Sequence, residues 1–233
     1  MSLKNNLKEM QTYFKNNNVL TKIEERYCYA TDASNYTGEV KIPDLVVFAE
    51  NVEDVKKVLL YANKNKIPVI SRGAGTNMVG SCICNKGGIV LNFSKMNKIL
   101  DFNPSNMTVC VEPGVVLGDL KNLVEKNGLF FPPDPSNFKV STIGGAIAQS
   151  SAGANSFKYG TIKDYVLSLS VIMADGTLVK FGADTVKDTS GYHLSQLIVG
   201  SEGTLGVIVG ATLKLIAKPE NKTVISAYFD DIS

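Results

Sequence analysis

The stretch LVVFAENVEDVKKVLLYANKNKIPVISRGAGTNMVG, residues 45–80, decides the first layer of the fold. The apolar run 45–49 is typical of a buried strand, and residues 52–62 place apolar side chains on one face of a helix. Asn51, three residues before Asp54, matches the start of a capped helix. A second apolar run, IPVIS, follows. The stretch therefore predicts a right-handed βαβ unit with parallel strands.

A glycine loop follows the second strand directly. Such a loop offers consecutive unhindered backbone N–H groups, which can bind phosphate oxygens. The third glycine of a G-x-G-x-x-G fingerprint is replaced by Met78, and no Lys-Ser/Thr pair follows as a P-loop requires. These departures disfavour a nicotinamide-dependent Rossmann enzyme. One such loop is equally consistent with a tight turn whose glycines serve only the backbone.

The second half of the chain predicts another, larger sheet. Three β-rich segments within residues 87–112 precede a helical pattern over 115–128 that stops at an Asn-Gly pair. The Asp175-Gly176 pair indicates a hairpin, and residues 206–217 indicate a last strand. The fold class is therefore α+β, with a small parallel layer and a larger, mainly antiparallel sheet with helices.

The composition of the chain excludes some classes of function. The chain has 233 residues, of which 44% are hydrophobic, and its formal charge is +2. No basic run interleaved with aromatic residues occurs, so nucleic-acid binding is not expected. The charged start and the broken apolar runs predict no signal peptide, no membrane span and a cytoplasmic location.

The possible metal ligands are few. There are four cysteines and one histidine, His193. Cys82 and Cys84 form C-x-C rather than the C-x-x-C of a redox pair or zinc knuckle. We therefore expect reduced structural thiols and no metal site.

Further glycine-rich or proline-rich clusters favour an extended ligand between two layers. With the loop, they form an ordered series that resembles the FAD-binding domain of the vanillyl-alcohol oxidase/p-cresol methylhydroxylase flavoprotein superfamily, and within it the FAD-linked D-lactate dehydrogenase and glycolate oxidase catalytic subunits. The series is SRGAGTN (71–77), GGIVLNFSKMNKIL (87–100), VEPGV (111–115), PPDPSN (132–137), STIGGAIA (141–148), KYG (158–160), MADGTLVKFG (173–182) and GSEGTLGVI (200–208).

The resemblance implies a two-subdomain FAD-binding fold that is not a Rossmann fold, with FAD between the subdomains. Residues 4–27 alternate charged and apolar residues at roughly helical spacing, which predicts an N-terminal helical arm. The resemblance divides the chain into that arm (1–40), a small subdomain (41–100), a larger subdomain (101–219) and the start of a truncated cap domain (220–233). It also implies a set of cofactor-binding residues, mostly acting through backbone. These are Arg72, Gly73, Ala74, Gly75, Thr76 and Asn77 at the pyrophosphate; Pro133, Asp134, Thr142, Gly144, Gly145, Ala148, Ser151, Gly153, Tyr159 and Gly160 around the flavin and ribityl chain; and Glu202, Gly203, Gly206, Val207 and Ile208 beside the adenosine half.

By the same resemblance the parent enzyme oxidises a small 2-hydroxy acid of the D-lactate or glycolate class, with FAD as the hydride acceptor. An electron-transfer flavoprotein, a quinone or an iron–sulfur subunit would take the electrons. The alternative is a non-catalytic FAD-binding electron-transfer subunit of a larger oxidoreductase. No catalytic residue is assigned, since relatives carry these in the cap domain. His193 stands where relatives commonly have Asp, and we interpret it as structural or surface.

The attachment of FAD can be tested directly. Relatives that bind the flavin covalently from this loop place a His near its end, as in R-x-G-G-H, where this chain has Ala74, Gly75 and Thr76. We therefore expect noncovalent FAD. Acid precipitation of the loaded protein should release all flavin into the supernatant, and yellow colour in the washed pellet would contradict this prediction.

Overall fold

The computed structural model describes residues 9–14, 16–229 and 231. Its helices, with the 3-10 turns η1 and η2, are η1 (Asn16–Asn18), α2 (Ile23–Tyr27), α3 (Val52–Asn65), α4 (Leu117–Lys126), α5 (Ile143–Ala148), α6 (Ser156–Tyr159), η2 (Ile162–Asp164) and α7 (Leu194–Ile198). Its strands are β1 (Val19–Leu20), β2 (Leu45–Phe48), β3 (Val69–Arg72), β4 (Ile89–Asn92), β5 (Ile99–Asn103), β6 (Thr108–Val111), β7 (Leu129–Phe130), β8 (Val166–Ile172), β9 (Leu178–Gly182), β10 (Val207–Lys214) and β11 (Ile216–Ala217). No helix in this part of the chain is both long and apolar enough to cross a bilayer.

The first sheet, sheet A, has the strand order β1-β2-β4-β3. Strands β2, β4 and β3 are parallel, and β1 pairs antiparallel with β2. The predicted β2–α3–β3 unit is confirmed as parallel, but β4 lies between its two strands. All four residues of β4 are buried, whereas β3 is mostly half-buried. A strand that is buried on both faces gains most from a central position, which explains the insertion.

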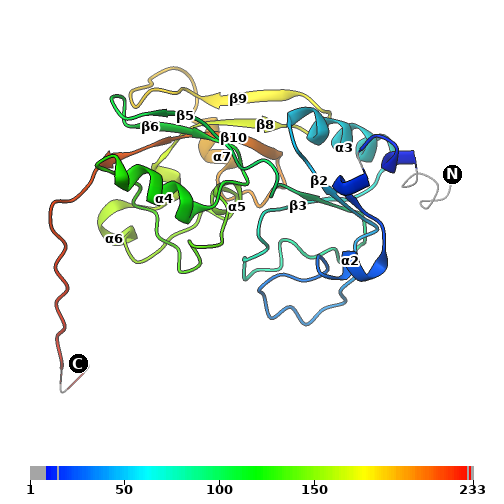
Figure 1. Cartoon of the computed structure of the whole chain (residues 1–233), viewed down its shortest axis with the longest axis horizontal. Coiled ribbons are helices and arrows are strands. Elements are labelled where there is room, and N and C mark those ends of the chain that lie inside the picture. The colour runs from blue at the N-terminus through cyan, green and yellow to red at the C-terminus, as the bar shows by residue number, and fades with distance from the viewer. Residues whose placement is uncertain (1–8, 15, 230, 232–233) are drawn as a thin grey trace.

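The second sheet, sheet B, is antiparallel and has the order β5-β6-β10-β8-β9. The predicted hairpin is confirmed: β8 pairs with β9 across a turn in which Gly176 has φ +83°. The predicted last strand is β10, which lies at the centre of the sheet with seven of its eight residues buried. Helices α4, α5 and α6 lie together below sheet B, while α3 covers sheet A (Figure 1).

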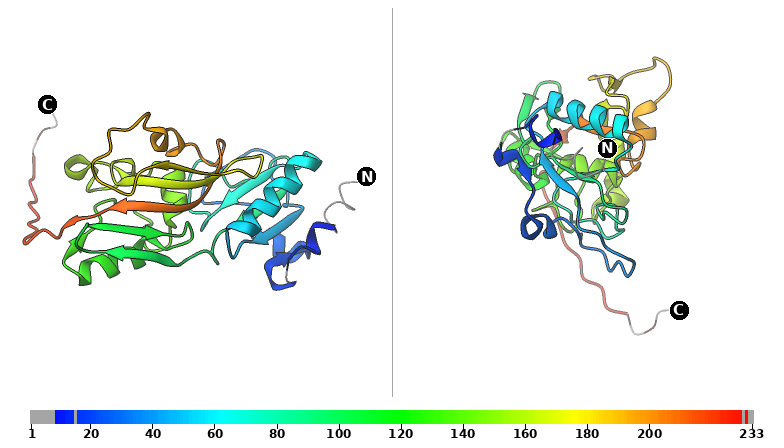
Figure 2. Two further views of the ribbon diagram at one scale, coloured as in Figure 1. Left: turned by 90° about the horizontal axis from the view of Figure 1, so that it is seen from above. Right: turned by 90° about the vertical axis from the view of Figure 1, so that its right-hand side faces the viewer.

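The two sheets lie end to end and share buried side chains (Figure 2). One core packs sheet B against α4 and α5. A second core packs α3 against sheet A, and it also contains Ile172, Val207 and Val209 from β8 and β10 of sheet B. The end of sheet B therefore completes the core of sheet A.

The N-terminal arm differs from the prediction of a helix over residues 4–27. Residues 1–8 and 15 lie outside the described residues. Residues 9–11 are helical, as predicted, but η1, β1 and α2 follow in place of a continuous helix, and β1 extends sheet A by pairing Val19 with Val47. The run of three asparagines at 16–18 disfavours a continuous helix, because their side chains compete for backbone hydrogen bonds. The proposed domain boundaries stay a prediction.

Asp184 fixes the loop after β9 to the face of sheet B. Its Oδ1 accepts hydrogen bonds from Ser168 Oγ at 2.6 Å and Thr212 Oγ1 at 2.8 Å. Both hydroxyl-bearing residues are buried. Burial raises the pKa of Asp184, but hydrogen bonds from Lys180, Ser168 and Thr212 outweigh it and hold the pKa below its ordinary value.

We expect Asp184→Ala to lower the free energy of unfolding by about 1–3 kcal/mol at pH 7, because two buried hydroxyls lose their acceptor. Since the folded pKa is depressed, this contribution is present above the unfolded pKa of about 4 and is lost as pH falls through the folded pKa. Urea titrations at pH 7 and pH 3 measure it. Asp188→Ala, in the same loop, loses one exposed bond to Ser190 N and serves as the control. Equal destabilisation by both variants would contradict the assignment.

Candidate functional site

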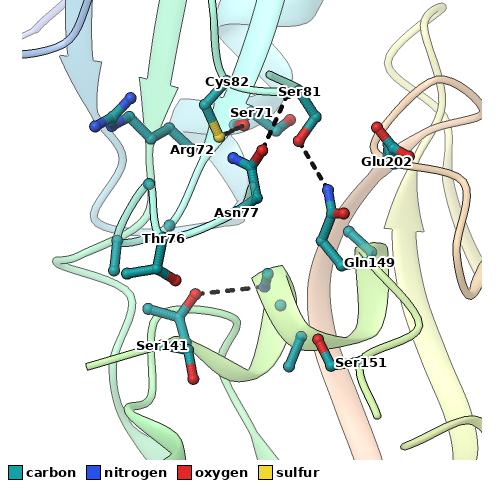
Figure 3. Close-up of a pocket in the computed structure, with 18 of the residues that line it drawn as sticks. Ser71, Arg72, Thr76, Asn77, Ser81, Cys82, Ser141, Gln149, Ser151 and Glu202 are labelled. Carbon is teal, nitrogen blue, oxygen red and sulfur yellow. Dashed lines mark hydrogen bonds between the residues drawn. The ribbon is translucent and has the colours of Figure 1, made fainter. Parts of the chain in front are cut away.

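A pocket of about 300 Å³ lies between the loop after β3, helix α5 and the turn before β10 (Figure 3). Small residues form most of its wall. Its lining consists of Ser71, Arg72, Gly73, Ala74, Gly75, Thr76, Asn77, Met78, Ser81, Cys82, Phe93, Pro113, Pro135, Ser136, Asn137, Ser141, Thr142, Gly144, Gly145, Ala146, Ala148, Gln149, Ser151, Ala152, Glu202, Gly203, Gly206 and Ile208.

The glycine loop presents free backbone donors to this pocket. Within the described part of the chain, the N–H groups of residues 73–78 donate no hydrogen bond. Gly75 has φ +70°, a left-handed conformation that glycine adopts without strain. Consecutive N–H groups around such a turn form a concave site for anionic oxygens. The loop can therefore hold a phosphate or diphosphate.

Other glycines keep the pocket open. A Cβ at Gly203 would meet only Ser71, at 3.7 Å, and one at Gly145 would meet only its own helix cap, Thr142. Both glycines line the pocket, so a larger side chain at either position would take up space there. Gly73 is different, since a Cβ there would lie 2.2 Å from Thr142 Oγ1. The loop therefore lies close to Thr142 at the start of α5, and a side chain at position 73 would overlap it.

Two buried polar atoms in the wall lack partners. Ser141 Oγ and Asn77 Nδ2 are inaccessible to solvent and make no hydrogen bond with acceptable geometry to any described residue, although Asp32 lies near Asn77. Buried polar atoms are rarely left unpaired in proteins. Together with the free loop amides, they fit a ligand that carries many hydrogen-bonding oxygens and nitrogens. FAD is such a ligand, so the residues present fit this cofactor.

Backbone contacts fix α5 at the floor of the pocket. Ile143 N donates to Val115 O, and Gly144 N donates to Pro113 O, both at 2.8 Å. A Cβ at Gly144 would lie 2.6 Å from Pro113 Cβ, so only glycine allows this approach. Thr142 caps the helix through its side chain, which accepts from Gly145 N.

The turn at 200–203 is attached to the other end of α5. Gly200 N donates to Ile147 O at 3.0 Å, and Glu202 N donates to Ala148 O at 2.9 Å. Glu202 has φ +54°, a left-handed conformation that costs a non-glycine residue of order 1 kcal/mol or more. The hydrogen bonds to the helix end offset that strain and direct Glu202 to the side of the pocket opposite Arg72 (Figure 3).

Two side-chain hydrogen bonds connect the pocket walls. Asn137 Nδ2 donates to Thr76 O at 3.3 Å, and Gln149 Nε2 donates to Ser81 Oγ at 2.7 Å. The second bond crosses the upper part of the pocket from α5 to the loop after β3 (Figure 3). These contacts hold the loop of sheet A against the helices of sheet B.

The ionisable groups of the lining are Arg72, Cys82 and Glu202. Burial raises the pKa of the Cys82 thiol, and the positive charge of Arg72 opposes that rise only in part. The thiol is therefore neutral at pH 7 and acts as a small apolar group. The four cysteines are free thiols. No cluster of three or more His, Cys, Asp or Glu that could hold a metal ion occurs in the described ranges.

The structure brings most of the predicted site residues together. The whole of 72–77, with Thr142, Gly144, Gly145, Ala148, Ser151, Glu202, Gly203, Gly206 and Ile208, lines the pocket. Pro133, Asp134, Gly153, Tyr159, Gly160 and Val207 do not line it. His193 is exposed at the start of α7 and also lies outside this pocket.

Two of the residues outside the lining, Asp134 and Gly153, contact other parts of the protein instead of the pocket. Asp134 turns its side chain to Lys121 of α4, with Nζ and Oδ1 2.7 Å apart. Its carbonyl oxygen lies 1.8 Å from where a Cβ at Gly153 would be, so Gly153 packs on the proline-rich segment. The next residues, 135–137, line the pocket instead. Since proline restricts the backbone on both sides, alternation alone does not reveal which residues of PPDPSN face inward.

Sequence reasoning missed several lining residues. Ser141 precedes the helix cap, Gln149 follows the helix, and Ser81 and Cys82 lie beyond the glycine loop. The run of mostly small residues from 141 to 151 was a usable signal for the first two. Nothing local marks Ser81 or Cys82, which reach the pocket because the loop folds back onto β3, where Cys82 Sγ contacts Ser71 O at 3.8 Å.

Comparison with known families identifies the domain. A family model described as "FAD binding domain" matches residues 43–182. This range contains sheet A, the glycine loop, α5 and the β8–β9 hairpin. The chain belongs to this family of FAD-binding domains, and FAD is its cofactor.

Curated relatives extend the match along the chain. The glycolate oxidase subunit GlcD of Bacillus subtilis (strain 168) is 41% identical over 207 residues, which are 89% of this chain and 44% of the relative. A D-lactate dehydrogenase of Anaerostipes hadrus is 44% identical over 184 residues, which are 79% of this chain and 38% of the relative. The chain thus spans less than half the length of these two relatives.

Solved structures confirm the fold class. An alkyldihydroxyacetonephosphate synthase superposes with a TM-score of 0.80 at 27% identity, covering 95% of this chain and 42% of the other. A p-cresol methylhydroxylase superposes with a TM-score of 0.77 at 19% identity, covering 94% of this chain and 44% of the other, and shows the fold alone. The predicted non-Rossmann α+β architecture is confirmed.

We expect Gly75→Val to weaken FAD binding by at least about 10-fold. A Cβ at Gly75 would lie 2.2 Å from Arg72 Nη2, so valine must displace either the Arg72 guanidinium or the loop. Gly128→Val is the matched control, because Gly128 has φ +72° but no atom within 4 Å of a Cβ. Both variants carry left-handed strain of order 1–3 kcal/mol. Fluorescence titration with FAD, alongside circular dichroism, measures the difference. Equal FAD affinities in the two folded variants would exclude the loop from the site.

Proposed function

We propose that this chain is the FAD-binding part of a flavin-dependent 2-hydroxy-acid dehydrogenase or oxidase of the D-lactate or glycolate class. The observation that carries the proposal is the glycine-walled pocket with free amides at residues 73–78, in a chain whose relatives are named for oxidation of these acids. The pocket supplies a place for a dinucleotide, and the relatives' names supply the substrate class.

The chain's own residues bind and orient the cofactor in this proposal. The amides of 73–77 hold the diphosphate, and Ser141 Oγ and Asn77 Nδ2 complete their hydrogen bonds on the ligand. Glycines 145 and 203 leave room for a planar ring system. In the proposed complex, Glu202 accepts hydrogen bonds from ribose hydroxyls. When bound, FAD supplies the hydride acceptor.

A small 2-hydroxy acid would be the substrate, and an electron-transfer flavoprotein, a quinone or an iron–sulfur subunit would receive the electrons. The cytoplasmic location stays a prediction, and a relative in Arabidopsis thaliana, 37% identical over 92% of this chain, is named as mitochondrial. The alternative, a non-catalytic FAD-binding electron-transfer subunit, predicts the same pocket. It differs because such a subunit does not oxidise a 2-hydroxy acid itself.

Titration of the purified chain with FAD tests the proposal directly. Saturable binding with flavin absorption bands that co-elute with the protein supports it. Absence of binding, in protein shown to be folded by circular dichroism, would overturn it.

We expect the FAD-loaded chain to oxidise D-lactate or glycolate at least about 100-fold more slowly than a full-length relative. Oxidation requires a group that accepts the hydroxyl proton, and loss of general-base catalysis typically costs about 10² to 10⁴ in rate. Of the ionisable groups in the lining, Arg72 is a permanent cation, Cys82 is a neutral thiol, and Glu202 is the carboxylate assigned above to the ribose hydroxyls. Anaerobic mixing with each acid, followed by flavin absorbance, measures the rate. Rapid bleaching would place the catalytic groups within these 233 residues.

A further inference from the structure

A second pocket lies beside α3, where the two sheets meet end to end (Figure 2). Its volume is about 300 Å³. Its apolar wall includes Leu59 and Ala62 of α3, Ile172 of β8, and Leu205 and Val207 near the start of β10. We call this space the junction pocket. An apolar pocket with a few convergent polar groups is the usual form of a small-molecule site.

The open edge of β3 supplies backbone hydrogen-bonding groups to the junction pocket. Ile89 N donates to Pro68 O. Phe93 N donates to Arg72 O, so alternate residues of this strand bond to β4. The N–H and C=O groups of Val69 therefore point to the opposite edge, where no strand of the described residues pairs. Val69 lines the pocket, and neither its N–H nor its C=O has a partner in the described part of the chain.

Tertiary contacts enclose this edge. A Cβ at Gly203, in the turn before β10, would lie 3.7 Å from Ser71 Cβ. Asn63 and Ala174 both line the pocket, and Asn63 Nδ2 donates to Ala174 O at 3.1 Å, which links α3 to the end of β8. Strands in proteins are usually about 5–6 residues long. A pocket of about 300 Å³ between such contacts suits a small molecule better than an added strand.

Lys66 gives the junction pocket a positive charge. Among the described residues that line this pocket, it is the ionisable one. Its Nζ lies 3.5 Å from Asn63 Oδ1, and no acidic side chain of the described residues forms an ion pair with it. Lys66 caps the C-terminus of α3 shortly before Val69, so it belongs to the N-terminal end of β3. A ligand with a carboxylate is complementary to this end of the pocket.

The junction pocket is separate from the pocket of the glycine loop. Ser71, Gly203 and Gly206 line both, and the rest of the two linings differ. These three residues therefore form a wall between the two spaces. A ligand in the junction pocket does not occupy the site of FAD.

We propose that the junction pocket binds a small apolar carboxylate that carries a hydrogen-bond donor on its α-carbon. The donor bonds to Val69 O, one carboxylate oxygen accepts from Val69 N, and the other faces Lys66. The alkyl group of the ligand lies against Leu59, Ile172 and Leu205. A branched 2-hydroxy acid and an N-acylated apolar amino acid both have this chemistry. The site goes beyond the proposed function and does not depend on FAD.

NMR titration of the nitrogen-labelled full chain, with and without saturating FAD, tests the site. The two probes are 2-hydroxyisocaproate, whose donor is a hydroxyl, and N-acetyl-leucine, whose donor is an amide N–H. Two further compounds each remove one feature: isocaproate lacks the donor on the α-carbon, and 2-hydroxyisocaproamide lacks the charge. The probe that binds more tightly identifies the source of the ligand, a free hydroxy acid or an acylated amino acid.

We expect at least one probe to bind with a dissociation constant of about 1 mM or below, with FAD or without it. The amide resonances of Val69 and Ser71 should shift on binding. Loss of the donor should weaken binding by about 2- to 10-fold, the usual net effect of one hydrogen bond. Loss of the charge should weaken it by up to about 5-fold in the wild type and have no effect in Lys66→Met. Lys64→Met is the matched control, since Lys64 also lies in the last turn of α3 but does not line the pocket.

A second pair of variants tests the location. Ala174→Trp should fill the pocket and weaken binding by at least about 10-fold. Leu178→Trp should bind like the wild type, because Leu178 is exposed on β9 and lies outside both pocket linings.

Four outcomes would overturn the inference: no saturable binding of either probe, displacement of the probe by FAD, unchanged binding in folded Ala174→Trp, or a charge effect that persists in Lys66→Met. A folded chain that binds a probe but not FAD would overturn the proposed function alone. The two failures are thus distinguishable within one set of titrations.

Discussion

The close backbone approach between Gly144 and Pro113 is the constraint on which the pocket depends. It allows Gly144 N to donate to Pro113 O, which places the start of α5 against the segment that follows β6. The other end of α5 then receives the amides of Gly200 and Glu202. One short helix therefore sets the distance between the glycine loop, the turn before β10 and the floor of the pocket.

The site is built from backbone more than from side chains. Small residues let the chain expose amides and leave space for a large ligand, and the few charged groups stand behind or beside that surface. Lys121 of α4 pairs with Asp134 of the proline-rich segment outside the pocket lining, whereas Arg72 lies under the loop with no acidic partner among the described residues. Affinity in such a site comes from the shape of the pocket, from amide donors and from the electrostatic potential. Such a site tolerates changes of sequence as long as the glycines keep their backbone conformations.

Sequence patterns predicted the elements with strong local signals and missed those that depend on distant contacts. The capped helix α3, the hairpin at Gly176 and the glycine loop each follow from residues within a few positions, and the structure contains them. The insertion of β4 between β2 and β3 depends on burial of both faces of the strand, which a short stretch of sequence does not indicate. The inward positions of PPDPSN and the outward direction of Arg72 likewise depend on neighbours more than 10 residues away, at Lys121 and Thr31.

The side chains shared by the two sheets have a consequence for cooperativity. Ile172, Val207 and Val209 belong to sheet B by hydrogen bonding and to the core of sheet A by packing. Separation of the sheets would expose these side chains together with the underside of α3, so sheet A does not retain its core without sheet B. Sheet A should therefore not outlast sheet B in a calorimetric scan, and the ligand cleft between them exists only as long as both sheets are folded.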